Sequence, residues 1–429
     1  MLAALFISLF ALLLLGMDIS LVMLGSAAIA IFFSQFSDFP LMIETISQHV
    51  FSGIDKFSFT AIPLFILAGE IMNKGLITDK LVRFSQTFLG HVPGGVAQTG
   101  VGLNVVMAGM SGSAVADCAS TGSILIPAME KEGYKPERAA AIIANASTIG
   151  PVFPPSIPMI LIGSIAGLSV GKLFMAGVVP GLLMGLALMI YIYIHAKKVK
   201  MELKEKTTFK EKFAATKSAF LALMLPVIII GSIIFGIASP TESAVLGVLY
   251  ALFITIFVYR SLSIKGLYHT LIDASVASGT IMLVSAAGVL FGWIATYYNL
   301  GDIVESLLFT FGDNPFVVLI LVNIMLLILG MVLEAIPIIL LTVPVLLPIL
   351  SQLGVDPVHA SIIIVVNLMI GLVTPPVGLH LFITASIAKV PITKVIKEST
   401  PFMLVLLIVL ALVTFLPEVS MFLPNILDT

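Results

Sequence analysis

Two short stretches govern how this chain folds: STIGPVFPPSIP at residues 147–158 and LMIGLVTPPVGL at residues 368–379. Both stretches contain the pattern I-G-x-V-x-P-P, and both lie between apolar runs. Proline lacks a backbone donor and clashes with the preceding helical turn, and glycine weakens helical order. The sequence therefore predicts that two apolar helices, one in each half of the chain, are broken in the same way.

The composition indicates a membrane protein. Of the 429 residues, 59% are hydrophobic and 10% are charged, whereas a soluble domain carries about 25% charged residues. Apolar runs such as 221–234 and 402–416 follow one another along the chain, and a spanning helix needs ~20 such residues. We expect an all-α integral membrane protein. The single cysteine, Cys118, excludes an internal disulfide, and no basic array suggests nucleic acid.

The chain divides at a basic segment near its midpoint. Residues 195–217 hold eight of the 21 lysines and arginines, and the positive-inside rule places them in the cytoplasm. The C-terminal residues 417–429 contain acids and no bases, which fits the outer side. We expect a first repeat over 1–194, a cytoplasmic linker over 195–217 and a second repeat over 218–429.

The two halves match without gaps when Gly150 is laid on Gly371. In this single register the other matched glycines and prolines are Pro127 with Pro348, Gly133 with Gly354, Pro136 with Pro357, Pro154 with Pro375, Pro155 with Pro376, and Pro180 with Pro401. Two helical hairpins are predicted at matching places, over 93–132 with an interruption at 109–117 and over 315–350 with an interruption at 330–337. The repeats have inverted topology if each of them crosses the membrane an odd number of times. Parallel repeats remain the alternative.

The remaining elements follow from the apolar runs. Spans are expected near 2–15, 19–36, 57–73 and 173–195 in the first half, and near 218–237, 241–260 and 270–298 in the second. An amphipathic piece at 38–56 is expected along the membrane interface. Broken-helix halves are expected at 136–149 and 157–167.

Helices broken at matching places in two halves indicate the binding site of a transporter, because irregular backbone at membrane depth is tolerated only inside protein or around a wet cavity. Half-helix N-termini suit a carboxylate, and unwound carbonyls suit a sodium ion. The breaks also supply uncharged side-chain oxygens, from Ser111, Ser113, Asn145, Ser147, Thr148, Asn367 and Thr374. Any single hydroxyl is as well explained by a hydrogen bond between helices.

Ionisable residues in apolar surroundings are functional candidates. Glu334 lies in the second hairpin interruption and Asp117 just after the first, whereas Glu70 lies near the end of a span. Glu242 follows Pro240 and is better explained as part of a helix cap than as an ion carrier. Surface roles are expected for Arg138 and His359. His380 could meet substrate or a proton, or pack with a hydrogen bond.

No enzyme motif is evident. The run GLSVGKL at 167–173 lacks the spacing of a phosphate-binding loop, and HExxH and GxSxG are absent from the sequence. Active transport would therefore be driven by an ion gradient. An intramembrane enzyme or a scaffold would need paired catalytic groups, and the isolated acids form no such pair in the sequence.

Four motifs together resemble one family. SGSAVAD at 111–117, NASTIGPVFPPS at 145–156, SPTES at 239–243 and GLVTPPVGL at 371–379 resemble the large membrane subunit (DctM/SiaM type) of tripartite ATP-independent periplasmic (TRAP) transporters, of the sialic-acid type. The resemblance covers essentially the whole chain. It implies an elevator fold of the ion-transporter superfamily, in the bacterial inner membrane, with sodium as coupling ion and no other cofactor.

The resemblance also implies partners and site residues. The partners are a small four-helix membrane subunit, expected as a separate chain, and a soluble periplasmic substrate-binding protein, with membrane lipid around the spans. The sodium candidates are Ser111, Gly112, Ser113, Asn145, Gly150 and Pro151 in one site, and Gly330, Glu334, Gly371 and Thr374 in the other. The substrate candidates are Ser113, Ser147, Pro154, Pro155, Thr374 and His380.

The expected function is sodium-coupled uptake of an organic anion that the binding protein delivers. Sialic acid is the first expectation and a C4-dicarboxylate the second, from the overall likeness of the chain to sialic-acid members of the family. The breaks also offer no arginine or lysine to a second carboxylate, which favours a monocarboxylate with many hydroxyls. The alternative is a stand-alone carboxylate transporter that needs no binding protein, and a neighbouring pair of partner genes would distinguish the two.

Overall fold

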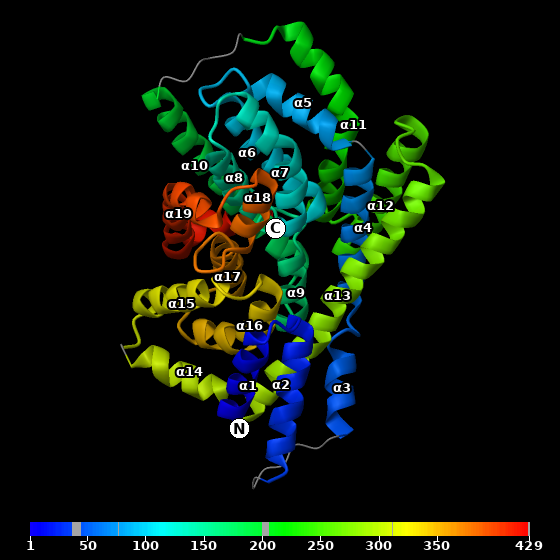
Figure 1. Ribbon diagram of the computed structural model, residues 1–429. Coiled ribbons are helices and arrows are strands. Elements are labelled where there is room, and N and C mark those ends of the chain that lie inside the picture. The colour runs from blue at the N-terminus through cyan, green and yellow to red at the C-terminus, as the bar shows by residue number, and fades with distance from the viewer. Residues whose placement is uncertain (37–43, 76, 200–205, 311, 428–429) are drawn as a thin grey trace.

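The computed structural model describes residues 1–36, 44–75, 77–199, 206–310 and 312–427. These residues form helices and connecting turns, without strands, arranged as Figure 1 shows. Six of the described helices are long and apolar enough to cross a membrane, or seven if the bent pair Thr45–Ser52 and Phe57–Lys74 forms one span. The prediction of an all-α membrane protein is confirmed.

The described residues of the first half form ten α-helices. They are α1 (Leu2–Leu14), α2 (Ile19–Ser34), α3 (Glu44–Ser52), α4 (Ala61–Lys74), α5 (Ile77–Leu89), α6 (Gly95–Ser111), α7 (Ala114–Lys131), α8 (Pro136–Ala146), α9 (Ile157–Ala166) and α10 (Val170–Val199), with 3-10 turns η1 (Phe57–Thr60) and η2 (Ser147–Ile149).

Ten more are formed by the part of the second half that the structure describes. They are α11 (Phe209–Ile234), α12 (Pro240–Phe253), α13 (Ile264–Tyr297), α14 (Leu300–Phe309), α15 (Pro315–Gly330), α16 (Ala335–Gln352), α17 (Pro357–Gly371), α18 (Leu379–Ala388), α19 (Ile392–Phe415) and α20 (Pro417–Leu427), with a π-helical turn η3 (Ile254–Val258) after α12.

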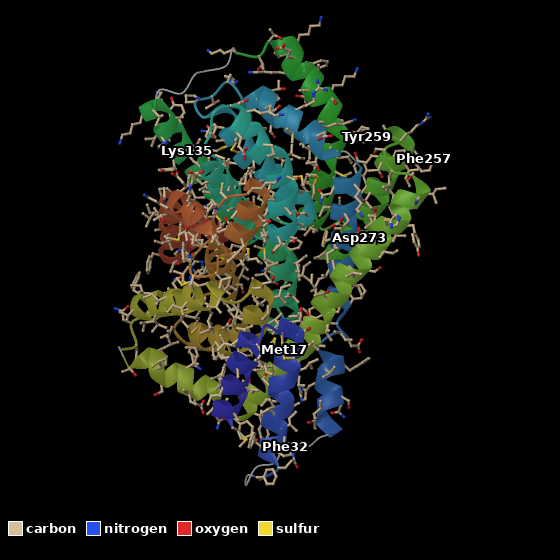
Figure 2. All side chains as sticks on the ribbon, in the orientation of Figure 1. Met17, Phe32, Lys135, Phe257, Tyr259 and Asp273 are labelled. Carbon is tan, nitrogen blue, oxygen red and sulfur yellow. The ribbon has the colours of Figure 1, made fainter. Side chains whose placement is uncertain are left out.

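Helix α13 organises one side of the molecule. Its 34 residues make a rod about 51 Å long at 1.5 Å per residue. It packs against α2, α3 and α4 and also against α16, and Figure 1 shows it running along these helices. In Figure 2, Asp273 lies on the part of α13 beside α4, where it forms an ion pair with Lys74. This side is called the α13 layer below: α1–α4 and α11–α13.

The hairpins and broken helices pack on the other side. Helix α8 contacts α7, α18 and α19, and α17 contacts α15, α16 and α19. Ala139–Ala146 of α8 and Val358–Gly371 of α17 are buried along their whole length. Both segments are largely apolar on every face, as expected for helices enclosed by other helices. They hold the two breaks inside the protein.

Matching elements begin at matching positions. Helices α7 and α16 begin at Ala114 and Ala335 and end at Lys131 and Gln352, in the register that lays Gly150 on Gly371. Helices α8 and α17 begin at Pro136 and Pro357, in the same register. The predicted hairpins and breaks therefore fall where the pattern placed them. The division into inverted repeats joined by a linker stays a prediction.

Other expectations need correction. The pattern did not predict α5, α14 or α20, because these are short helices in which apolar and polar residues alternate at helical spacing. Helix α10 extends to Val199 and α11 begins at Phe209, inside the basic segment, while 200–205 lie outside the described residues. The first part of the amphipathic piece at 38–56, residues 38–43, also lies outside them.

A surface role is wrong for His359. This side chain is 2% exposed, and its Nδ1 lies 2.7 Å from the hydroxyl oxygen of Ser420 on the unpredicted helix α20. Arg138 contacts Glu398 of α19 at 3.5 Å. The capping interpretation of Glu242 is confirmed, because Ser239 and Glu242 form a reciprocal capping box at the start of α12.

Candidate functional site

The first hairpin tip fits against the first break. Gly112 ends α6 in a left-handed conformation at φ +60°, which glycine adopts without steric cost. A Cβ at Gly112 would lie 2.7 Å from the carbonyl oxygen of Pro155. Ser113 then caps α7 by accepting from the Ala116 N–H at 3.4 Å. The tip and the break are thus in direct contact, at a place where a larger residue would not fit.

The first break runs from η2 to the start of α9. Its Pro154–Pro155 peptide bond is cis. Ser156 donates its hydroxyl to the Pro151 carbonyl oxygen at 2.5 Å and accepts from the Met159 N–H at 3.2 Å. Ser156 is therefore the side-chain cap of α9 and ties the start of that helix to the unwound segment.

The second hairpin and break repeat this arrangement with different residues. A Cβ on Gly371, at the end of α17, would lie 2.7 Å from the Cα of Gly330. The Val377 N–H donates to the Met331 carbonyl oxygen at 3.3 Å. The Pro375–Pro376 bond is cis, and Gly378 has a φ of +59° before α18. The hairpin and the break again meet through glycine.

Several side-chain oxygens in the hairpins and broken helices are buried without a hydrogen-bond donor in the described residues. They are Oδ2 of Asp117, and the Oδ1 atoms of Asn104, Asn145 and Asn367. The other carboxylate oxygen of Asp117 accepts from the Ser111 hydroxyl at 2.5 Å. The Asn145 amide nitrogen donates to Ser399 at 2.7 Å and to the Ala141 carbonyl oxygen at 2.8 Å. Unpaired buried acceptors are costly, and cations are the ligands that they suit.

His380 links the two breaks. It lies in the first turn of α18, is fully buried, and has its Nδ1 3.0 Å from the hydroxyl oxygen of Ser147. Its carbonyl oxygen accepts from the Thr384 hydroxyl at 2.9 Å. This is the hydrogen-bonded packing that the sequence left open, and Nε2 has no partner in the described residues.

The hairpin tips and breaks surround a cavity of about 310 Å³, called the convergent cavity below. Four of its lining residues are the first residues of half-helices: Ala114 of α7, Ile157 of α9, Ala335 of α16 and Leu379 of α18. Gly112, Ser113 and Pro151 also line it, and α13 contributes Ala277, Thr280 and Ile281. The cavity therefore lies between the α13 layer and the broken helices.

A second cavity of about 380 Å³ shares Thr280, Glu334, Leu372 and Leu379 with the first. Asp18 and Met17, from the turn between α1 and α2, line it from the α13 layer, and Figure 2 shows Met17 at the junction of this turn with α13. Asp18 accepts from the Ser20 hydroxyl and the Ser20 N–H, and these bonds lower the pKa of its carboxyl.

The predicted site residues divide into three groups. Gly112, Ser113, Pro151, Gly330 and Glu334 line one or both cavities. Gly371 packs on Gly330, and Ser111 and Gly150 contact Asp117. The lining of the two cavities does not include Asn145, Ser147, Pro154, Pro155, Thr374 or His380.

Two lining residues have no signal in the sequence. Asp18 and Thr280 lie in the α1–α2 turn and in the middle of α13, far from either break along the chain. Only packing brings them to the cavities. Asp117 could be singled out as an acid after a hairpin interruption, but its unpaired oxygen required the structure.

Comparison with known proteins identifies the family. The family model of the tripartite ATP-independent periplasmic transporter, DctM component, matches residues 6–419. The chain belongs to the DctM family. It is thus a large permease of a TRAP transporter, a multi-pass protein of the bacterial inner membrane and not an enzyme.

Curated DctM relatives differ in what they transport. The chain is 36% identical to the 2,3-diketo-L-gulonate permease YiaN of Escherichia coli over 94% of both chains. It is 36% identical to the sialic acid permease SiaM of Vibrio cholerae and 38% identical to the C4-dicarboxylate permease DctM of Pseudomonas aeruginosa, each over 90% of both chains.

Solved structures support the fold of this DctM chain. The YdaH transporter of Alcanivorax borkumensis matches with a TM-score of 0.66 and 12% identity, covering 92% of this chain and 95% of the other. MtrF of Neisseria gonorrhoeae matches with a TM-score of 0.57 and 13% identity, covering 92% and 93%. At these identities the likeness concerns the fold alone.

Proposed function

We propose that this permease takes up an organic anion by sodium-coupled symport, through elevator-type alternating access. The observation that carries the proposal is the convergence of four half-helix N-termini on one cavity. Each N-terminus presents unpaired N–H groups and about half a positive charge. A carboxylate is the group that such a cavity favours.

The capping pattern adds to this argument. Helices α7 and α9 are capped by the side chains of Ser113 and Ser156, whereas α16 and α18 begin without a side-chain cap among the described residues. First-turn N–H groups without a cap need water or a ligand as acceptor. In α18 the His380 N–H already donates to the Leu372 carbonyl oxygen at 3.1 Å and the Leu381 N–H to the Gly378 carbonyl oxygen at 2.8 Å. The start of α16 at the second hairpin tip is therefore the better donor site for an anion.

The sodium part of the proposal rests on the buried acceptors. Hard cations take oxygen ligands such as carboxylates, amides and backbone carbonyls. The unpaired oxygens of Asp117, Asn145 and Asn367 lie beside the breaks, in a part of the membrane protein where a lone carboxylate is expensive. In this proposal the remaining oxygens come from the other predicted ligands. These are Ser111, Gly112, Ser113, Gly150 and Pro151 in one site, and Gly330, Glu334, Gly371 and Thr374 in the other.

Sialic acid is the first substrate in this proposal and a C4-dicarboxylate is the second. Relatives named for each substrate are about equally similar to the chain, and the ranking rests on the absence of arginine and lysine from the two breaks. A small membrane subunit and a soluble periplasmic binding protein complete the transporter. One relative, the isethionate permease DctMQ of Oleidesulfovibrio alaskensis, is covered over only 62% of its length, as expected where the small subunit is fused.

The test is uptake of labelled sialic acid into proteoliposomes that hold this chain and its small subunit. Uptake is measured with and without an inward sodium gradient, and with and without the binding protein loaded with sialic acid. We expect uptake only when both are present. Uptake that needs sodium but no binding protein would favour a stand-alone transporter. Equal uptake with and without a sodium gradient would overturn the coupling.

A further inference from the structure

One tyrosine beside the α13 layer brings cations from three elements together. The Lys80 ammonium of α5 lies 3.3 Å from the centroid of the Tyr259 ring, which is a cation–π contact. The Tyr259 hydroxyl donates to the Ser218 carbonyl oxygen of α11 at 3.3 Å. Lys217 precedes Ser218 in the chain, and Arg260 follows Tyr259. These three cations are called the Tyr259 cluster below: Lys80, Lys217 and Arg260.

The Tyr259 cluster has no counter-ion among the described residues. The two ion pairs that these residues form lie elsewhere, one between α4 and α13 and one between α8 and α19. Lys80 is half-buried, whereas Lys217 and Arg260 are exposed. Because like charges repel one another, an anion from outside the chain would stabilise the cluster.

The backbone beside the cluster departs from an ordinary helix. Helix α12 continues into the π-helical turn η3, after which the Tyr259 N–H donates to the Ile254 carbonyl oxygen at 2.7 Å. Arg260 then has a φ of +52°, a conformation that glycine adopts without steric cost and that other residues rarely adopt. Both features are enriched at functional sites. An arginine at a position that suits glycine indicates that its charge has a role.

The cluster lies where the inner leaflet of a membrane would meet the protein. Lys217 is the last residue of the basic segment 195–217, which the positive-inside rule assigns to the cytoplasm. Helix α12 and η3 together form the candidate span Pro240–Val258, and Arg260 follows its end. Cations at this boundary would face the headgroups of cytoplasmic-leaflet lipids.

An exposed apolar stripe runs along the same span toward the cluster. It consists of Val245, Leu249, Phe253 and Phe257, which are 40%, 58%, 56% and 67% exposed. Their four-residue spacing places them on one helix face, and Figure 2 shows Phe257 toward the rim of the molecule. The stripe is about 18 Å long at 1.5 Å per residue, a little more than half of the ~30 Å hydrocarbon core. This length suits an acyl chain of one leaflet.

We propose that the Tyr259 cluster and the stripe bind one anionic phospholipid of the inner leaflet. Its phosphate lies between Lys80 and Arg260, and one acyl chain lies along the stripe. Arginine suits this role because its planar donors can bind two phosphate oxygens at once. Cations without a counter-ion from the protein favour a lipid of net negative charge over a zwitterionic one. This site is separate from the convergent cavity and does not depend on the proposed function.

The test is lipid binding to the purified chain with its small subunit, measured by native mass spectrometry. The complex is titrated with phosphatidylglycerol or phosphatidylethanolamine of equal chain length. Lys80→Gln/Arg260→Gln removes two cations, and Arg260→Gly removes one while suiting the left-handed backbone. The matched control is Lys131→Gln/Lys394→Gln, which removes two exposed lysines from α7 and α19. Thermal unfolding shows that each variant is folded.

We expect the wild type to bind phosphatidylglycerol about 25-fold or more tightly than phosphatidylethanolamine at low salt, because each basic residue near an anionic headgroup contributes about 5-fold. Arg260→Gly should lower this preference about 5-fold, and Lys80→Gln/Arg260→Gln about 25-fold. High salt should also lower it, through screening. The lysine control should keep the preference. Phe253→Ala/Phe257→Ala should weaken both lipids and leave the preference unchanged.

Four results would overturn the inference. The first is equal binding of the two lipids by the wild type. The second is an unchanged preference in folded Lys80→Gln/Arg260→Gln. The third is displacement of the lipid by millimolar inorganic phosphate, which would show an anion site without an acyl contact. The fourth is a structure of the complex in which the small subunit or a second copy of the chain covers the stripe.

Discussion

Gly330 and Gly371 pack against one another where α15 and α17 end. A Cβ on Gly371 would lie 2.7 and 2.8 Å from two backbone atoms of Gly330, and backbone cannot move aside as a flexible side chain can. Gly371→Ala should therefore lower stability by about 1–3 kcal/mol, the usual cost of overpacking. Thermal unfolding of the purified protein measures this.

Gly279 provides the control for this substitution. It lies inside α13, and a Cβ added there would meet no heavy atom within 4 Å, so Gly279→Ala should gain up to about 1 kcal/mol from helix propensity. An equal effect of the two substitutions would mean that the contact between the second hairpin and its break is not tight.

Substitution of Asn145 tests whether a single side-chain oxygen belongs to the first sodium site. Its Oδ1 has no donor in the described residues, while its amide nitrogen donates to Ser399. Asn145→Ala should raise the sodium concentration for half-maximal uptake about 10-fold, if Oδ1 contributes roughly 1.4 kcal/mol of binding. Ser399→Ala leaves Oδ1 in place and should change the sodium requirement much less. Similar sodium curves for wild type and Asn145→Ala would remove this residue from the site.

At the scale of elements, local chemistry decides helix ends. The capping box of α12 joins Ser239 to the Glu242 N–H at 3.3 Å and the Glu242 carboxylate to the Ser239 N–H at 2.7 Å. Ser239→Ala should cost about 1 kcal/mol of stability without altering the sodium requirement. Thr241→Ala changes a residue that lies between the two members of the box, and it should leave the stability nearly unchanged. A lost sodium response in Ser239→Ala would give this turn a role in transport.

The sequence could predict those elements that carry strong local signals. Proline pairs and glycines located both breaks and both hairpins, and Pro240 with Glu242 located the start of α12. Helices α5, α14 and α20 were missed because they are short and depend on neighbours. Helix α20, for example, is held by His359 of α17 through Ser420. Such contacts between distant segments are invisible in one sequence.

At the scale of the whole molecule, packing assembles the site. Hairpin tips and breaks from opposite halves of the chain line one cavity, and α13 completes it with Thr280. The pattern predicted which segments are irregular, but not that four half-helix N-termini face one space. It also could not place Asp18 beside Glu334, because the α1–α2 turn reaches the cavity only through the packing of α2 on α13.

The position of the bound substrate decides whether the convergent cavity is the transport site. Cryo-electron microscopy of the chain with its small subunit, in saturating sodium and the transported acid, would locate it. We predict density in the convergent cavity, with the acid group facing the first turns of α7, α9, α16 or α18. Density elsewhere, for example in the apolar groove that Phe153 and Pro226 line between α6 and α11, would show that the four helix N-termini do not bind the substrate.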